Sequence, residues 1–228
     1  EPAYIHSFAK SVHYLNFTGY PFAGNPLSIL FHAKPFIENF KWKPERGTNI
    51  YVFDRNSGEL VKKFETDPFF AFHHINAFEE KEEIFFDIVA YPDPDIIDSF
   101  YLDRIRAEDQ ILPGGEIRRY RLNPTGNGSV DYEVLSDEGI ELPRFDYDTL
   151  NMDGTYQYVY SIGVRKSKRN SFYDQIVKTD LKSGKSKVWY EENCFPGEPV
   201  FLPDPEGKKE DDGVNLSVVL DEANGNSF

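Results

Sequence analysis

Short runs in which apolar and polar residues alternate follow one another along most of the chain. A period of two predicts half-buried strands, because successive side chains of a strand point to opposite faces of a sheet. Asn, Asp, Ser and Gly lie between the runs, and these residues tolerate a positive φ or cap their own backbone. The pattern therefore predicts an all-β fold. Its clearest strands are residues 14–17, 49–53, 84–89, 156–162 and 214–220.

Only residues 95–108 indicate a helix. Within this segment Ile96, Ile97, Phe100 and Ile105 recur at roughly helical spacing. Elsewhere the chain is rich in aromatic residues, with 20 Phe and 14 Tyr, which favours strands. We therefore expect one helix in an otherwise β chain.

Two segments of the chain follow the same plan. Residues 50–58 and residues 176–184 each read as a strand, an Asp and a tight Ser-Gly turn. After a second strand the first copy reaches His73 and the second reaches Glu198. A repeated hairpin that delivers a chemically active residue is typical of propeller blades, whose inner strands meet at an axis. Any antiparallel protein can also contain two similar hairpins, so both interpretations stay open.

Charge and cysteine content exclude several classes of protein. The 228 residues carry a net charge of -14, and nucleic acid is therefore not an expected partner, because phosphate binding needs a basic surface. Cys194 is the single cysteine, so no intrachain disulfide can form, which fits a reducing compartment. No signal peptide and no apolar run of membrane-spanning length is present. We expect a cytoplasmic protein.

The ends of the sequence indicate an internal piece of a longer protein. The chain begins at Glu1 rather than at a methionine, and its single methionine is Met152. Residues 224–228 read as a hairpin turn whose second strand has not begun.

Residues 26–42 differ from the rest of the chain because apolar residues predominate and lysines lie among them. The segment includes Leu30, Phe31 and Trp42, with Lys34 and Lys41 interspersed. One interpretation is a loop packed on the core. The other is an exposed apolar patch that enters a membrane interface, which would make the protein a peripheral membrane protein.

Two of the five histidines have the setting of a metal ligand. His6 and His73 each follow an apolar approach and precede a small or polar residue. His74 would point to the opposite side of a strand from His73. His13 and His32 have no such setting, and we interpret both as background. The chain has no HExxH, CxxC, P-loop or GxSxG motif, which removes the commonest zinc, nucleotide and hydrolase interpretations.

Two carboxylates are candidates for orienting a histidine. Glu141 and Glu198 are both flanked by apolar residues and proline. A buried carboxylate needs a partner, and a metal-bound histidine often donates its second ring N–H to such a group. An ordinary salt bridge would explain the same pattern, so both roles stay open.

Taken together, these residues resemble the carotenoid cleavage oxygenase family, which includes the β-carotene oxygenases and the retinoid isomerase of the retinal pigment epithelium. The similar segments occur in the order of the family and at its approximate spacing, and they run nearly end to end. Two further segments, 87–91 and 100–102, are most similar to the animal-type branch. The five segments that carry the resemblance are residues 2–8, 72–79, 141–147, 196–201 and 210–217.

The resemblance implies a seven-bladed β-propeller with one non-haem Fe(II), held by four histidines that three glutamates orient. His6 and His73 match two of the histidines, and Glu141 and Glu198 match two of the glutamates. We expect Glu141 to orient His73 and Glu198 to orient a fourth histidine beyond Phe228.

The remaining histidine and glutamate are expected before the first residue of the chain. Residues 1–228 would then be a single incomplete propeller domain, about half of the family domain. With two ligands in place of four, we expect this piece alone to be inactive.

The activity implied is that of a dioxygenase, which uses O2 to cleave a C=C bond of a carotenoid or apocarotenoid to aldehydes. The iron site also fits a retinoid isomerohydrolase, and a metal-free binding propeller is a third alternative. A long apolar substrate needs an aromatic-lined tunnel. The candidate lining residues, for which core packing is the alternative, are Tyr4, Phe72, Tyr91 and Leu142.

Overall fold

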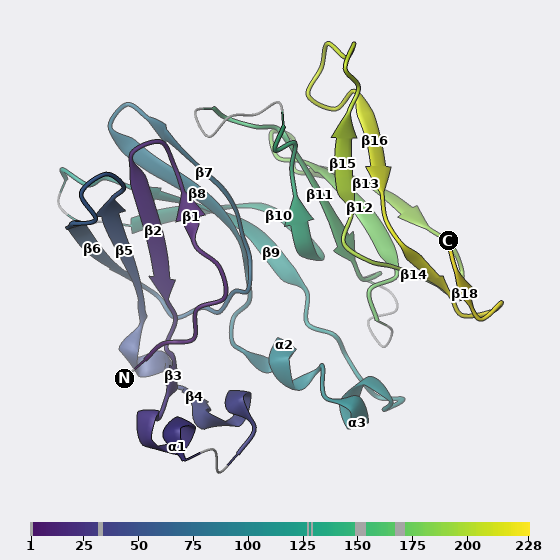
Figure 1. The fold of residues 1–228 in the computed structure, drawn as a ribbon, viewed down its shortest axis with the longest axis horizontal. Coiled ribbons are helices and arrows are strands. Elements are labelled where there is room, and N and C mark those ends of the chain that lie inside the picture. Colours follow the sequence, from purple (N-terminus) through teal and green to yellow (C-terminus); the bar gives the residue numbers. More distant parts are fainter. Residues whose placement is uncertain (1, 32–33, 127, 129, 149–153, 167–171) are drawn as a thin grey trace. The chain divides into compact units, whose positions relative to one another are not determined.

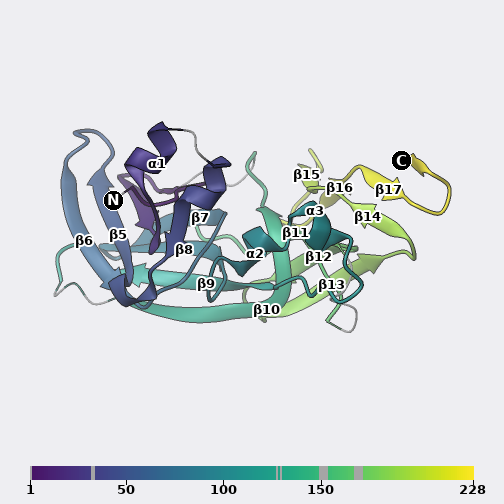
Figure 2. The same cartoon turned by 90° about the horizontal axis from the view of Figure 1, so that it is seen from below.

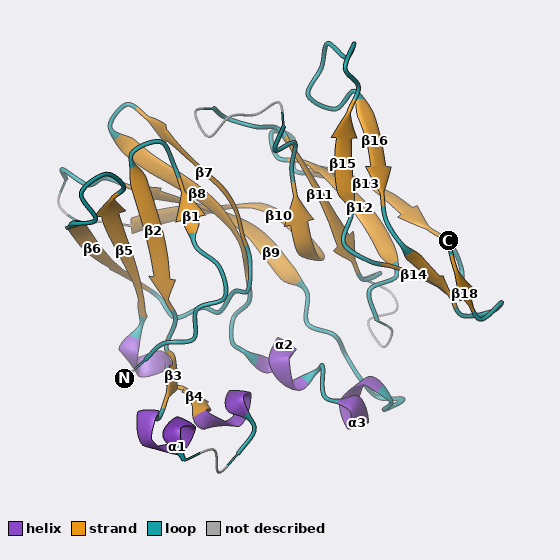
Figure 3. Cartoon of the chain, in the orientation of Figure 1, coloured by secondary structure: helices purple, strands orange, loops and turns teal. Residues whose placement is uncertain are grey.

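The computed structural model describes the chain except for residues 1, 32–33, 127, 129, 149–153 and 167–171. Its described residues are mostly strands and loops, with few and short helices (Figure 3). The all-β prediction is therefore confirmed. The chain divides into two compact units, which are described separately below. The first unit is Glu1–Pro94 with Tyr120–Tyr132, and the second is Asp95–Arg119 with Glu133–Phe228.

The first unit is built on a four-stranded antiparallel sheet (Figure 1). Ile50 and Val52 on the third strand are fully buried and alternate with partly exposed neighbours, as the period-two pattern predicts. Phe64 on the fourth strand is buried on the same sheet. In spatial order the strands are β1 (Ala9–Lys10), β2 (Tyr14–Gly19), β5 (Thr48–Asp54) and β6 (Leu60–Thr66).

Besides residues 120–132, the rest of the first unit includes two antiparallel strand pairs and short helical turns. One pair is β7 with β8, and the other is β3 with β4. A helix capped by the Asn25 side chain lies between β3 and β4. The bounds are β3 (Phe22–Gly24), α1 (Pro26–Leu30), the 3₁₀ turns Phe36–Asn39 and Pro44–Arg46, β4 (Phe40–Trp42), β7 (His74–Glu80) and β8 (Glu83–Ala90).

The second unit contains antiparallel sheets and two short helices. Figures 1 and 2 show β9 and β10 as long strands, and each belongs in part to both units. Within the second unit β10 is followed in spatial order by β11, β12 and β13. These strands are β9 (Gly115–Leu122), β10 (Val130–Arg144), β11 (Tyr158–Gly163), β12 (Gln175–Asp180) and β13 (Lys185–Tyr190).

Smaller sheets follow towards the C-terminus. In one of them β17 lies between β14 and β18, and in the other β15 pairs with β16. The remaining elements are α2 (Asp95–Asp98), α3 (Leu102–Ile105), β14 (Cys194–Pro196), β15 (Val200–Pro203), β16 (Gly213–Leu216), β17 (Val219–Asp221) and β18 (Asn226–Ser227).

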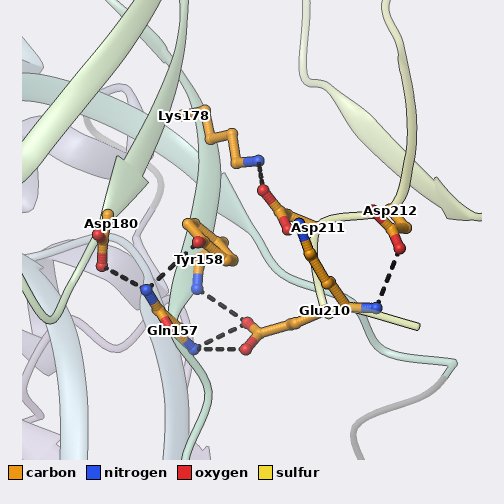
Figure 4. A network of polar contacts seen from close by, with 8 residues as sticks. Gln157, Tyr158, Lys178, Asp180, Glu210, Asp211 and Asp212 are labelled. Carbon is orange, nitrogen blue, oxygen red and sulfur yellow. Dashed lines mark hydrogen bonds and ion pairs between the residues drawn. The ribbon is translucent and has the colours of Figure 1, made fainter. Parts of the chain in front are cut away.

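A polar network holds the loop before β16 onto β11 and β12 (Figure 4). The Glu210 carboxylate accepts hydrogen bonds of 2.8–2.9 Å from the backbone N–H groups of Gln157 and Tyr158, at the start of β11. Lys178 on β12 forms a 2.7 Å ion pair with Asp211 and lies 4.4 Å from the centre of the Tyr158 ring. This loop therefore has a structural function in joining neighbouring sheets of the second unit.

Two of the predicted elements are divided in the structure. The prediction of a single helix over 95–108 is wrong. The segment forms two separate helices, α2 and α3, and Tyr101 between them has an extended backbone. The single strand expected over 214–220 is also wrong. The Ser217 hydroxyl donates to the Gly197 carbonyl at 2.8 Å, and this bond accompanies a break between β16 and β17. Apolar spacing does not reveal such breaks, because both halves keep the same pattern.

Two other boundaries also differ from the prediction. The run expected to begin at Tyr156 forms a strand only from Tyr158, at the point where Glu210 binds its backbone. The hairpin expected over 224–228 does have a second strand, β18, which pairs with β17. The other predicted strands, at 14–17, 49–53 and 84–89, are confirmed as β2, β5 and β8.

The repeated hairpin predicted from the sequence is present in both places. In the turn from β5 to β6 the Asp54 side chain accepts from two backbone N–H groups, and Gly58 has a φ of 72°. In the turn from β12 to β13 the Asp180 side chain accepts from the Lys182 N–H and the Ser183 hydroxyl, and Gly184 has a φ of 68°. The hairpin turn predicted at residues 224–228 has the same design, with Asp221 and Gly225 in the corresponding positions, but it was not recognised as a third copy from the sequence. Its strands are short, so the surrounding pattern is weak.

The turn between β7 and β8 is strained. It pairs Glu80 with Glu83 and leaves Lys81 and Glu82 as a two-residue loop with φ values of 51° and 66°. A left-handed backbone is costly for residues with a side chain, and Asn-Gly is the sequence that fits this turn best. We expect Lys81→Asn with Glu82→Gly to raise the free energy of unfolding by about 1 kcal/mol, measured by urea denaturation.

The turn at Gly58 tests the cost of a left-handed backbone in the opposite direction, by adding a side chain instead of removing one. A Cβ on Gly58 would meet no atom within 4 Å, so Gly58→Ala changes only the backbone preference. With a φ of 72° we expect a loss of about 1 kcal/mol. An increase in stability from Gly58→Ala would contradict this explanation of both turns.

Candidate functional site

Backbone pairing holds the aromatic approach to His73 in place. Phe70 and Tyr91 exchange two backbone hydrogen bonds of 2.9 and 2.7 Å. The His73 carbonyl then accepts from the N–H of Val89 at 3.0 Å. Phe70 and Tyr91 are fully buried, whereas His73 is partly exposed. The run of aromatic residues therefore ends in an imidazole at the boundary of the core.

A second segment brings His6 beside His73. The backbone N–H of Tyr4 donates to the Phe22 carbonyl at 2.9 Å and anchors the segment on β3. The two imidazole centroids are 5.0 Å apart, with ring planes at 89°. The Phe72 ring lies edge-on to His6, at 5.6 Å between centroids. The two histidines predicted as metal ligands are thus neighbours in space, although they are far apart in sequence.

His74 has a different environment from His73. Its Nδ1 lies 2.8 Å from the Ser7 hydroxyl and its Nε2 lies 3.0 Å from the Thr18 hydroxyl. Burial of the ring, and to a lesser extent the charge of His73, lowers the pKa of His74 to about 3. His74 is therefore neutral at neutral pH. Because both of its ring nitrogens contact hydroxyls of the protein, His74 has the environment of a structural histidine.

His13, interpreted from the sequence as background, also contacts a carboxylate. Its Nδ1 lies 2.7 Å from Glu79, which also accepts a 2.6 Å hydrogen bond from the Ser11 hydroxyl. His13 is largely exposed, and this cluster joins the end of β1 to β7. The other histidine interpreted as background, His32, lies outside the described residues.

The two candidate glutamates lie in the second unit. Glu141 is buried, and its Oε2 accepts a 2.9 Å hydrogen bond from the N–H of Leu142. Leu142 has a φ of 48° and lies at a bulge in β10. The function expected of Glu141 stays a prediction, because His73 belongs to the other unit.

Glu198 is half-exposed and forms a 3.5 Å ion pair with Arg144. The Arg144 guanidinium in turn lies over the Tyr147 ring, 4.8 Å from its centre. The structure therefore gives Glu198 the salt bridge that was one of its two expected functions. Its expected function towards a fourth histidine stays a prediction.

The residues expected to line a tunnel fall into two groups. Tyr4 and Phe72 are partly exposed, with ring centroids 6.5 Å apart, and burial raises the pKa of Tyr4. Tyr91 is fully buried and lies 6.4 Å from Phe72, so core packing accounts for it. Leu142 belongs to the second unit, and its expected function is not tested by these contacts.

The donor set matches a metal centre in kind but not in number. Neutral imidazoles suit iron among the transition metals. Within the residues that the structure describes, however, no group of three or more His, Cys, Asp or Glu side chains could hold a metal ion. The role of His6 and His73 as metal ligands therefore stays a prediction.

Comparison with known proteins assigns the chain to a family. A family model described as retinal pigment epithelial membrane protein matches residues 1–228. The chain belongs to this family. It is 32% identical over 229 residues to the carotenoid isomerooxygenase of Galleria mellonella, an alignment that covers 96% of this chain and 44% of that protein. It is 31% identical to the beta,beta-carotene 15,15'-dioxygenase of Homo sapiens, covering 96% of this chain and 45% of that protein.

The structure is also similar to solved structures of the retinal pigment epithelial membrane protein family and its relatives. The cobalt-substituted apocarotenoid oxygenase of Synechocystis matches with a TM-score of 0.86 and 30% identity, over 99% of this chain and 46% of that chain. These matches confirm the family resemblance and the expected fold, a partial β-propeller. The chain spans less than half the length of these relatives.

Proposed function

We propose that this chain supplies two iron ligands, His6 and His73, to a non-haem Fe(II) dioxygenase that cleaves a C=C bond of a carotenoid or apocarotenoid. The observation that carries the proposal is the approach of the two imidazoles to 5.0 Å at the end of an aromatic segment. Relatives named as carotenoid oxygenases, which match 96% of the chain, support the choice of reaction.

The residues near the two histidines suit this chemistry. When bound, Fe(II) would supply the centre at which O2 reacts with the polyene to give two aldehydes. His6 and His73 would hold the ion as neutral donors, which leaves its positive charge uncompensated. Tyr4 and Phe72 present partly exposed aromatic rings beside the histidines and would bind an apolar polyene in their vicinity.

The proposed iron site needs more ligands than this chain supplies. The remaining ligands would come from the part of the relatives' length that the chain does not span. Glu141 and Glu198 would orient histidines of the site through the second ring nitrogen. Residues 1–228 alone are expected to be inactive as an oxygenase.

Isomerisation is a second candidate activity, because the 32% identical relative is named an isomerooxygenase. The two activities can be separated by their products. The full-length protein would be analysed for bound iron and then incubated with β-carotene in detergent and, separately, with a retinyl ester. An aldehyde from the carotenoid is the expected result. Retinol from the ester, without an aldehyde from any carotenoid, would contradict oxidative cleavage. A full-length protein that contains no iron would instead favour a metal-free binding protein.

The segment 26–42 is proposed to contact a membrane, from which the apolar substrate would enter. Its described part exposes Leu27, Leu30, Phe31 and Phe36, with exposed fractions of 65%, 67%, 75% and 61%, and residues 32–33 lie outside the described residues. Among the described residues, no helix has the length and apolar character needed to cross a bilayer. Several large exposed apolar side chains within one short segment are typical of an interfacial contact.

Replacing Leu30 and Phe31 with Ser is expected to weaken binding of the full-length protein to liposomes. The change removes from the proposed interface the two most exposed large apolar side chains among the described residues of the segment. Co-sedimentation with phospholipid vesicles measures the effect. Val214→Ser with Leu216→Ser is the control, because these residues are also exposed but lie on β16. Equal partition of both double variants and the unmodified protein would contradict a membrane contact at 26–42.

A further inference from the structure

One hydroxyl connects the two segments that carry His6 and His73. The Ser7 hydroxyl, which directly follows His6, donates to the carbonyl of Phe72 at 2.7 Å. It also accepts from the backbone N–H of His74 at 2.9 Å. These two partners are the residues immediately before and after His73. A single side chain therefore binds the backbone on both sides of one histidine and is covalently adjacent to the other.

The hydrogen-bonding capacity of Ser7 is fully used. A serine hydroxyl has one donor and two acceptor positions. The proton is used towards Phe72, so Ser7 must accept from both the N–H and the Nδ1 of His74. Nδ1 of His74 is then protonated, and its Nε2 is an acceptor. The Thr18 hydroxyl, 3.0 Å away, must donate to Nε2. Each hydrogen-bonding hydrogen of Ser7, His74 and Thr18 in this group therefore has a single acceptor.

This assignment excludes a nucleophilic function for Ser7. A serine nucleophile transfers its proton to a base, whereas the Ser7 proton is directed to a backbone carbonyl. His74 cannot act as that base, because its Nδ1 already carries a proton in the arrangement described. The contacts of Ser7 are those of a residue that fixes backbone geometry.

We propose that Ser7 is a positioning residue that sets the spacing and orientation of His6 and His73 as iron ligands, with His74 and Thr18 holding Ser7 in place. The inference rests on the proposed function, because it assumes that the two histidines bind iron. Metal sites depend on the groups that orient their ligands, and loss of such a group commonly lowers affinity by about 10-fold to 100-fold. Ser7 acts through the backbone rather than through the imidazole ring.

Ser11 provides a matched control. Ser11 is buried, and its hydroxyl, like that of Ser7, joins the segment around β1 to the segment of β7, through a 2.6 Å hydrogen bond to Glu79. Ser11→Ala and Ser7→Ala therefore remove the same group from the same pair of segments. Of the two serines, only Ser7 directly follows His6 and binds the residues on both sides of His73. A general loosening of the two segments would affect metal binding equally in both variants.

The test measures the affinity of the full-length protein for Fe(II), and for Co(II) as a spectroscopic probe, in four forms. We expect Ser7→Ala to weaken metal affinity by about 10-fold or more and to change the visible absorption of bound Co(II). Ser7→Thr keeps the hydroxyl and is expected to stay within about 3-fold of the unmodified protein. Ser11→Ala is expected to leave affinity and spectrum unchanged, although it lowers the melting temperature.

Each outcome has a distinct meaning. A folded Ser7→Ala variant with unmodified affinity and spectrum would overturn the inference, and so would equal losses in Ser7→Ala and Ser11→Ala. If Ser7→Ala does not fold, Ser7→Cys replaces it, and this weaker hydrogen-bonding group must weaken metal binding if the inference is right. Retention of iron by His73→Ala would instead contradict the proposed function itself, before Ser7 is considered.

Discussion

Replacing His73 with alanine in the full-length protein is expected to abolish iron binding and turnover, whereas His74→Ala is expected to keep the iron. His73 lies 5.0 Å from His6 between ring centroids, and its removal would take away a ligand. His74 directs its two ring nitrogens to Ser7 and Thr18. In His74→Ala the backbone bonds of Ser7 to residues 72 and 74 can remain. Metal analysis and aldehyde formation from β-carotene measure the two effects.

For stability the order of the two variants should be reversed, with the larger loss in His74→Ala. His74→Ala leaves two hydroxyls without their imidazole partner, which is expected to lower the free energy of unfolding by about 1–3 kcal/mol. His73 is partly exposed, and its replacement should change stability less in the metal-free protein. If His74→Ala loses the iron while His73→Ala keeps it, the wrong histidine of the pair has been assigned to the metal.

Replacing Phe70 with alanine is expected to have the largest effect on stability, a loss of about 3–5 kcal/mol. The Phe70 ring is fully buried among four aromatic side chains, with centroid distances of 5.0–5.8 Å. The substitution would leave a cavity next to the segment that carries His73. Urea denaturation of the metal-free protein measures the loss of stability. The four neighbouring rings are Tyr4, Tyr20, Phe22 and Phe72.

Two further variants separate the cavity from other effects. Phe70→Leu keeps much of the buried volume and is expected to lose less than half as much stability as Phe70→Ala. Phe31→Ala removes an equally large ring that is 75% exposed, and is expected to change stability by less than about 0.5 kcal/mol. Similar losses from Phe31→Ala and Phe70→Ala would contradict the assignment of Phe70 to the core.

The alternation of apolar and polar residues predicted most of the strands but not where they are interrupted. β2, β5 and β8 lie where the pattern indicates. The break between β16 and β17 depends on a hydrogen bond from Ser217 to Gly197, a residue distant in sequence. The late start of β11 depends on the Glu210 carboxylate. Such boundaries are set by tertiary contacts, which a local pattern does not contain.

The candidate site was predicted in part for a similar reason. An imidazole at the end of an apolar run is visible in the sequence, and both His6 and His73 were recognised in this way. Ser7 and Thr18 were missed, because hydroxyl side chains are common in any sequence and the shared partner, His74, lies more than fifty residues away from both. The one available signal was the position of Ser7 directly after a candidate ligand.

The pairing of His74 with two hydroxyls has a consequence for how the chain reaches its native fold. A shift of β7 by one residue would exchange His73 and His74 between the two sides of the strand. A shift in one direction would bring Ile75 to the position of His74, and its apolar side chain would leave the Ser7 and Thr18 hydroxyls without the two ring nitrogens that they contact. Loss of a hydrogen-bond partner costs about 1–3 kcal/mol for each buried polar group. Ser7 and Thr18 thus act against misfolding by making that shifted register higher in energy than the native one.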